Sequence, residues 1–165
     1  MKTQLTLIPK VFTHPKSAFM SLPSDRWFIL AWIAPLYFGV ARAFRSPNYE
    51  TAAATFGGPL GLFGFTLVLG AIVLPICFWI LKQILKLFRK YLTVKKLMNI
   101  YGYSLVPRLV VAAIGYLLMF AFPSSFVPDA GLSPFLIFIL GIGLLAILYT
   151  LFLFIYGIVV SSSNK

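Results

Sequence analysis

Few side chains in this sequence could perform acid–base, nucleophilic or metal chemistry. The 165 residues include one histidine, His14, one cysteine, Cys77, and three acids, Asp25, Glu50 and Asp129, which lie far apart. Catalysis and metal binding need such groups at defined spacings, and the sequence has no HExxH, GxSxG, Cys/His pair or paired carboxylates. His14 has no second ligand at a suitable spacing. The sequence therefore predicts a protein without enzymatic activity, metal or cofactor.

The basic residues are the more informative group. Fourteen Lys and Arg side chains give a net charge of +11. The densest cluster lies in 82–96 and consists of Lys82, Lys86, Arg89, Lys90, Lys95 and Lys96. Its spacing opposite apolar residues such as Ile84 and Phe88 predicts one amphipathic basic helix. We expect this helix to attract anionic lipids or to bind an acidic membrane or cytoplasmic protein, and the simpler alternative is that its charges only fix the topology.

The segment YGYSLVPR holds a second group of candidates: Tyr101, Gly102, Tyr103, Pro107 and Arg108. Gly102 permits a positive φ or a close backbone approach, the tyrosines suit the headgroup level, and Pro107 suits the first turn of a helix. The segment is therefore predicted to start a membrane helix. A break in the membrane that faces a substrate or partner is the alternative.

Arg108 allows two interpretations. If the helix begins at Ser104, the guanidinium is shallow and can extend back to the phosphates of the cytoplasmic leaflet. If the helix begins near Asn99, the guanidinium lies deeper and needs an anion, for which Asp25 is the candidate.

The elements that carry these residues are apolar blocks long enough to cross a bilayer. Apolar residues make up 61% of the chain and charged residues only 10%, whereas soluble domains carry about 25% charged residues. Four spans are predicted, at about 27–44, 58–81, 104–122 and 134–160, so the fold is expected to be an all-α, multi-pass transmembrane bundle. The 134–160 block is expected to form one long helix; the alternative is a re-entrant pair broken near Gly141 and Gly143.

The distribution of cations predicts the orientation. Residues 1–26, the 82–96 connection and the 161–165 tail hold most of the Lys and Arg side chains, including Arg26 and Lys165, whereas the other connections hold Arg45 and Asp129. Both termini are therefore expected to face the cytoplasm. Because the cations lie between apolar blocks, a nucleic-acid partner is not expected. Residues 1–26 should form an N-terminal segment at the interface, ahead of one membrane domain over 27–160. Within it, residues 13–25 should form a short helix, capped by Thr13, that lies flat on the membrane surface.

Small residues predict close helix packing. Gly57, Gly61 and Gly64 follow one another at steps of about one turn, and Gly143, Thr150 and Gly157 share one face of the last span. Such faces serve packing within a bundle or homo-oligomer formation, and the sequence does not distinguish the two.

Three features resemble the Yip family, in particular its short bacterial-type members. They are VFTHPKSAFMSL at 11–22, YGYSLVPRLV at 101–110, and the order of two spans, a basic connection, the Gly-Tyr span and a long apolar segment. The resemblance implies an integral membrane protein of trafficking or envelope organisation, here in a bacterial cytoplasmic membrane. Members usually have five spans, and the acidic Asp-Leu-Tyr-Gly-Pro element of the eukaryotic branch is absent from this sequence. No activity transfers to particular residues.

These observations favour a membrane scaffold, adaptor or lipid-organising protein that acts through a basic cytoplasmic face. The alternative is a small passive channel or a bundle that translocates lipids or small molecules. The acids all lie in connections, which argues against ion-coupled transport. Polar residues within the spans are too few for an aqueous pore.

Overall fold

The structure is a computed structural model that describes residues 6–25, 27–44, 46–121 and 134–162. Over these residues it is helical and contains no strand. The helices are α2 (Leu7–Thr13), α3 (Pro15–Met20), α4 (Leu30–Phe44), α5 (Tyr49–Thr55), α6 (Pro59–Leu87), α7 (Val94–Ser104), α8 (Val106–Ala121) and α9 (Pro134–Ser162). The expected all-α fold is confirmed. Arg26, Arg45, Asp129 and Lys165 lie outside the described residues.

Three stretches are long and apolar enough to cross a membrane: Pro59–Leu87, Val94–Leu118 and Ile137–Ser162. They match the second, third and fourth expected spans in order. The first expected span forms α4, a shorter apolar helix of 15 residues with Pro35 inside it. The last block is the single long helix α9, without a break at Gly141 or Gly143.

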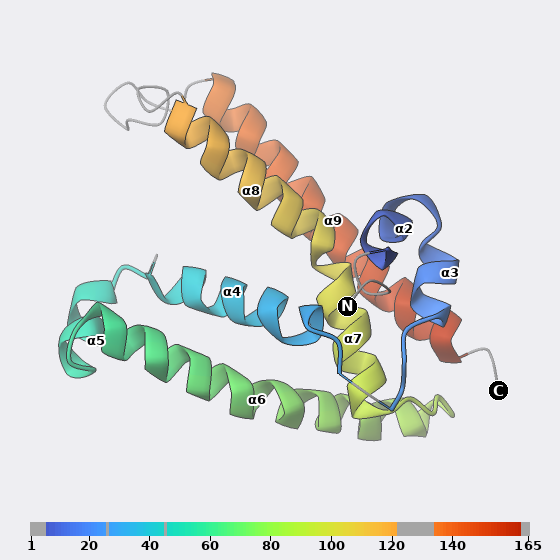
Figure 1. Ribbon diagram of the computed structural model, residues 1–165. Helices are drawn as coiled ribbons and strands as arrows, with labels where there is room; N and C mark the ends of the chain where they lie inside the picture. Colours follow the sequence, from blue (N-terminus) through green and yellow to red (C-terminus); the bar gives the residue numbers. More distant parts are fainter. Residues whose placement is uncertain (1–5, 26, 45, 122–133, 163–165) are drawn as a thin grey trace.

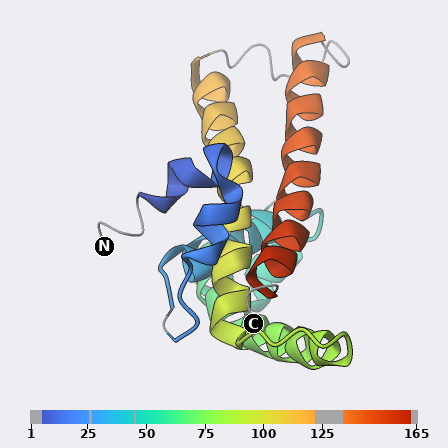
Figure 2. The same ribbon diagram turned by 90° about the vertical axis from the view of Figure 1, so that its right-hand side faces the viewer.

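The long helices form two arms that diverge from one end of the molecule (Figure 1). The first arm pairs α4 with α6, and the second pairs α8 with α9. Both arms meet at α7, where α2, α3 and the C-terminal ends of α6 and α9 also gather (Figures 1 and 2). We call this end the apex.

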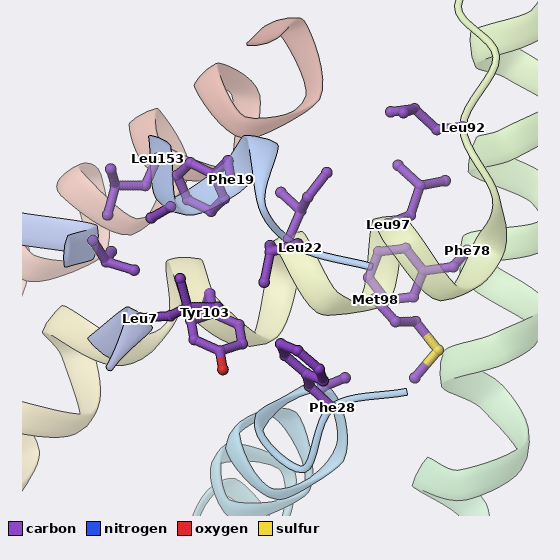
Figure 3. Close-up of a cluster of buried hydrophobic side chains, with 14 residues drawn as sticks. Leu7, Phe19, Leu22, Phe28, Phe78, Leu92, Leu97, Met98, Tyr103 and Leu153 are labelled. Atoms are coloured by element: carbon purple, nitrogen blue, oxygen red, sulfur yellow. The ribbon is translucent and has the colours of Figure 1, made fainter. Parts of the chain in front are cut away.

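Helix α7 is the centre of the apex and is the most buried of the apolar helices. Of the apolar window in Val94–Leu118, 56% is buried, against 6% in α6 and 11% in α9. Its residues Leu97 and Met98 lie beside Phe78 of α6, and the same core cluster extends to Phe19 of α3 and Leu153 of α9 (Figure 3). The apolar core therefore lies at the apex, while the arms leave most of their apolar surface to the surrounding medium.

The third span starts ten residues earlier than the sequence predicted, at Val94 instead of Ser104. The side chain of Thr93 caps α7, accepting a hydrogen bond of 3.1 Å from the backbone N–H of Lys96. The chain bends at Leu105 between α7 and α8 (Figure 1), because the ring of Pro107 crowds the carbonyl of Tyr103 and offers it no N–H. The YGYSLVPR segment thus lies within the helical rod and does not start it.

The predicted single basic helix over 82–96 is wrong. Helix α6 ends at Leu87 with two hydrogen bonds typical of a Schellman motif: Lys90 N–H donates to Leu85 O at 2.9 Å and Arg89 N–H to Lys86 O at 3.0 Å. The motif requires a left-handed residue, and Arg89 supplies it with φ 56°. The amphipathic spacing continued through this turn, and Thr93 then starts a new helix.

The N-terminal segment also differs from the prediction. Thr13 ends α2, where its hydroxyl donates to Pro9 O at 3.3 Å, and does not cap α3. Ala18, Phe19 and Leu22 are buried in the core of the apex. This face of the segment therefore packs against α7 and α9 and is not free to lie on the bilayer.

Candidate functional site: the basic apex and the central cleft

Lys96 differs from the other cations of the basic cluster because it is buried, with only 7% of the residue exposed. Its ammonium donates to Phe19 O at 2.9 Å, to Met20 O at 3.3 Å and to Leu22 O. These carbonyls lie at and after the C-terminus of α3, where the last carbonyls of a helix lack the N–H of a following turn. The Phe19 carbonyl also accepts from Leu22 N–H at 3.4 Å and from the Ser161 hydroxyl at 3.3 Å. Lys96 is therefore a structural residue, and its expected place on a lipid- or partner-binding surface is wrong.

Asn99 continues this contact one turn further along α7. Its side-chain oxygen accepts from Phe28 N–H at 2.9 Å, and its amide donates to Pro23 O at 3.1 Å. The sequence analysis gave Asn99 no role beyond a helix boundary. The available signal was its spacing of three residues from Lys96, which places both polar side chains on one side of an otherwise apolar helix.

The other five cations form what we call the basic surface: Lys82, Lys86, Arg89, Lys90 and Lys95. They lie on the end of α6, the following turn and the start of α7. Lys86 and Arg89 are exposed and the other three are half-buried. Lys95 donates to the backbone carbonyl of Asp25 at 2.7 Å, and its ammonium lies 6.0 Å from the ring centroid of Trp27.

Large aromatic side chains accompany the basic surface. Trp79, Phe88 and Tyr91 are all exposed beside it. Aromatic residues next to cations are typical of the interface between hydrocarbon and headgroups. Within the described ranges, Glu50 on α5 lies at the far end of the first arm, so the apex and that end differ in charge as well as in packing (Figure 1).

The second feature is the central cleft, a space of about 920 Å³ lined by α4, α8 and α9 together with Leu74 and Tyr101. Arg108 contributes the half-buried cation of its wall. The guanidinium carbon lies 4.2 Å from the centroid of the Phe38 ring, a cation–π contact. Arg42, one turn after Phe38 on α4, is an exposed second cation of the wall.

The early start of α7 favours the deeper of the two expected positions of Arg108. Arg108 follows Val94 by 14 residues, which is ~21 Å along a helix at ~1.5 Å per residue, so it lies well beyond the basic surface at the start of α7. The expected pairing with Asp25 is not present: Asp25 lies at the apex beside Lys95. Among the residues that the structure describes, no acid lines the cleft or pairs with Arg108.

The remaining residues of the YGYSLVPR segment pack inside the protein. A Cβ on Gly102 would overlap the backbone carbonyl of Leu30, so this glycine serves a close approach of α4 and α7. Tyr103 is buried against Phe28, with ring centroids 5.9 Å apart. Tyr101 contacts the rings of Phe78 and Phe154, each at 5.4 Å. The tyrosines are therefore core residues and do not anchor the chain at headgroups.

The first set of small residues shapes a turn. Gly57, with φ 76°, precedes α6, and a Cβ on Gly61 would overlap the carbonyl of Phe56 in the same turn. Gly64 faces open space. These glycines therefore make no close contact between long helices within the described chain, and a role in homo-oligomer formation stays a prediction.

The second set of small residues, Gly143, Thr150 and Gly157, lies in different surroundings along α9. A Cβ on Gly157 would lie 2.6 Å from Ile100 and 3.1 Å from Phe19, so close packing occurs there, at the apex. Thr150 is buried, and its hydroxyl has no hydrogen-bond partner among the described residues. Gly143 meets nothing within 4 Å and lines the central cleft.

The family model of the Yip1 domain matches residues 10–163. The chain belongs to the Yip1 domain family. The match takes in part of α2 and all helices from α3 to α9, so this Yip1 domain comprises the apex and both arms. No curated protein and no solved structure matches the chain. The resemblance inferred from the sequence is confirmed, and with the long apolar helices it identifies a multi-pass membrane protein.

Proposed function

We propose that this Yip1 domain is a non-enzymatic membrane scaffold that organises anionic lipids around its basic surface. The observation that carries the proposal is the gathering of Lys82, Lys86, Arg89, Lys90 and Lys95 around one helix turn, bordered by exposed aromatic rings. Such a surface attracts anionic headgroups by roughly 1 kcal/mol per cation. A role in topology alone requires neither this clustering nor the aromatic border.

The basic surface faces the cytoplasm in this proposal. Lys and Arg are retained on that side of a bacterial cytoplasmic membrane, and α2 and the end of α9 lie at the same end as the basic surface (Figure 1). Both termini then face the cytoplasm as well. Single cysteines at Lys90 and Glu50, each in a Cys77→Ser background, should react with membrane-impermeant reagents from opposite sides of the membrane.

The lipid preference can be measured on the full chain in bilayers with spin-labelled lipids. We expect a labelled anionic phospholipid to associate more strongly than a zwitterionic one, and the preference to weaken with salt. The variant Lys82→Gln, Lys86→Gln, Arg89→Gly, Lys90→Gln should lose most of it. The matched control Lys82→Arg, Lys86→Arg, Lys90→Arg keeps the charge and should keep the preference.

Two results would contradict this function. If the neutralised variant prefers the anionic lipid as strongly as the wild-type protein does, the cations have a role in topology only. A wild-type protein without any preference, but with binding of an acidic protein at the same surface, favours an adaptor.

A further inference from the structure

We infer that the central cleft holds one acidic glycerophospholipid, whose phosphate group pairs with the guanidinium of Arg108. This inference does not rest on the basic surface, because the cleft lies between the arms and is lined by other residues. It concerns a single bound lipid inside the membrane domain, whereas the basic surface acts on headgroups at the apex.

The charge of Arg108 needs an anion that the described chain does not supply. The guanidinium lies well along the α7–α8 rod, is half-buried, and contacts the Phe38 ring. A charged side chain in this position within a membrane is costly unless it is paired. Stacking on Phe38 occupies one face of the guanidinium and leaves its N–H groups free to form paired hydrogen bonds with phosphate oxygens.

The walls of the cleft fit the rest of a phospholipid. Its volume of about 920 Å³ falls within the range of small-molecule sites. Apolar side chains of α8 and α9, including Val111, Leu140, Leu144 and Ile147, line it beside Arg108. The arms diverge from the apex (Figures 1 and 2), so acyl chains can extend from the cleft into the bilayer without crossing a polar surface.

Other occupants fit these walls less well. A free phosphate ion would leave the apolar walls uncovered. A second copy of the chain would bring a net charge of +11 and another Arg108 towards the first. Only an anionic amphiphile satisfies both the cation and the apolar walls.

The binding can be tested with bimane attached to a Leu144→Cys variant in a Cys77→Ser background. The labelled protein is placed in nanodiscs, and quenching by phospholipids that carry a nitroxide on the acyl chain is measured. A charge-assisted pair predicts that phosphatidylglycerol quenches with about a tenfold lower Kd than phosphatidylcholine. Arg108→Gln should abolish this difference, and Arg108→Lys should retain part of it, because lysine keeps the charge but not the planar fork.

Two controls locate the effect. Bimane at Leu148→Cys, outside the residues that line the cleft, should show a preference that does not depend on Arg108. Lys16→Gln removes a cation from an exposed site on α3 and should leave the quenching at Leu144→Cys unchanged.

Three outcomes would overturn the inference. Equal quenching by the two lipids that Arg108→Gln leaves unchanged shows an apolar groove without headgroup recognition. An equal loss in Lys16→Gln shows an effect of total charge. Efficient disulfide formation between two unlabelled Leu144→Cys chains shows a second copy in the cleft. If Arg108→Gln does not fold, the Arg108→Lys result decides alone. Failure of the basic surface to select lipids would leave the signal at Leu144→Cys intact.

Discussion

The apex and the arms contain the same apolar residue types, but these residues pack against one another at the apex and face the surrounding medium in the arms. In the arms, only a small share of the residues of α6 and α9 is fully buried, so their hydropathy selects the membrane as their medium. At the apex, α7 contains Lys96, Asn99 and Ser104 and yet is the best buried helix. Lys96 and Asn99 hold specific backbone groups of the 19–28 segment, and Ser104 donates to Tyr101 O within α7. The comparison shows that the apolar content of a helix determines whether the membrane can surround it. A few polar side chains with hydrogen-bond partners determine which helix occupies the centre of the apex.

A substitution at Gly102 should have the largest effect on this contrast. Gly102→Ala places a methyl group on the Leu30 backbone, which cannot yield as a side chain can, and should lower the free energy of unfolding by about 3 kcal/mol. The control Gly141→Ala meets open space on α9 and should leave stability unchanged or raise it by up to about 1 kcal/mol. SDS titration of the detergent-solubilised protein measures both. Equal effects would show that the two helices are packed alike.

Replacing Lys96 should have the next largest effect. Lys96→Met retains most of the side-chain volume but removes the ammonium that donates to the carbonyls of Phe19, Met20 and Leu22. The Phe19 carbonyl keeps the hydroxyl of Ser161 as a donor. We expect a loss of about 2 kcal/mol. Lys95→Met, which removes one donor from a half-buried position with a single hydrogen bond, should cost about 0.5 kcal/mol. The same unfolding titration compares them, and a larger loss for Lys95→Met would contradict the assigned contacts.

Gly157 and Gly143 compare two positions on the same helix, one at the apex and one in the cleft. Gly157→Ala presses on the side chains of Ile100 and Phe19, which can shift, and should cost about 1 kcal/mol. Gly143→Ala meets nothing within 4 Å and should be neutral or slightly stabilising. The same SDS titration of the detergent-solubilised protein would rank them. The reverse order would place the close packing in the arm.

The smallest effect is expected at the turn that separates α6 from α7. Arg89→Gly should raise stability by about 0.5 to 1 kcal/mol, because glycine adopts the left-handed conformation of Arg89 without the steric cost of a Cβ. Lys90→Gly, outside that conformation, should lower it. A lower melting temperature for Arg89→Gly than for wild type would indicate that the helix does not end here.

The sequence was sufficient for the arms and insufficient for the apex. Long apolar blocks located α6 and α9 because hydropathy is a local property of each block. The first turns of α7 were missed because Lys95, Lys96 and Asn99 lower the local hydropathy, and the carbonyls that accept their hydrogen bonds lie 70 to 77 residues away in the chain. The basic-helix prediction failed for a related reason, since amphipathic spacing continues through a turn that Arg89 makes in a conformation typical of glycine. The position of Arg108 along the α7–α8 rod was left open for the same reason, because it depends on where α7 begins.

The carbonyl contacts of Lys96 also have a consequence for covalent chemistry. An amine that is 7% exposed and engaged by three acceptors is a poor nucleophile toward acylating reagents, whereas Lys86 is exposed to them. Treatment of the folded protein with an acetylating reagent should therefore modify Lys86 and spare Lys96, and the acetylation of Lys96 reports the opening of the apex.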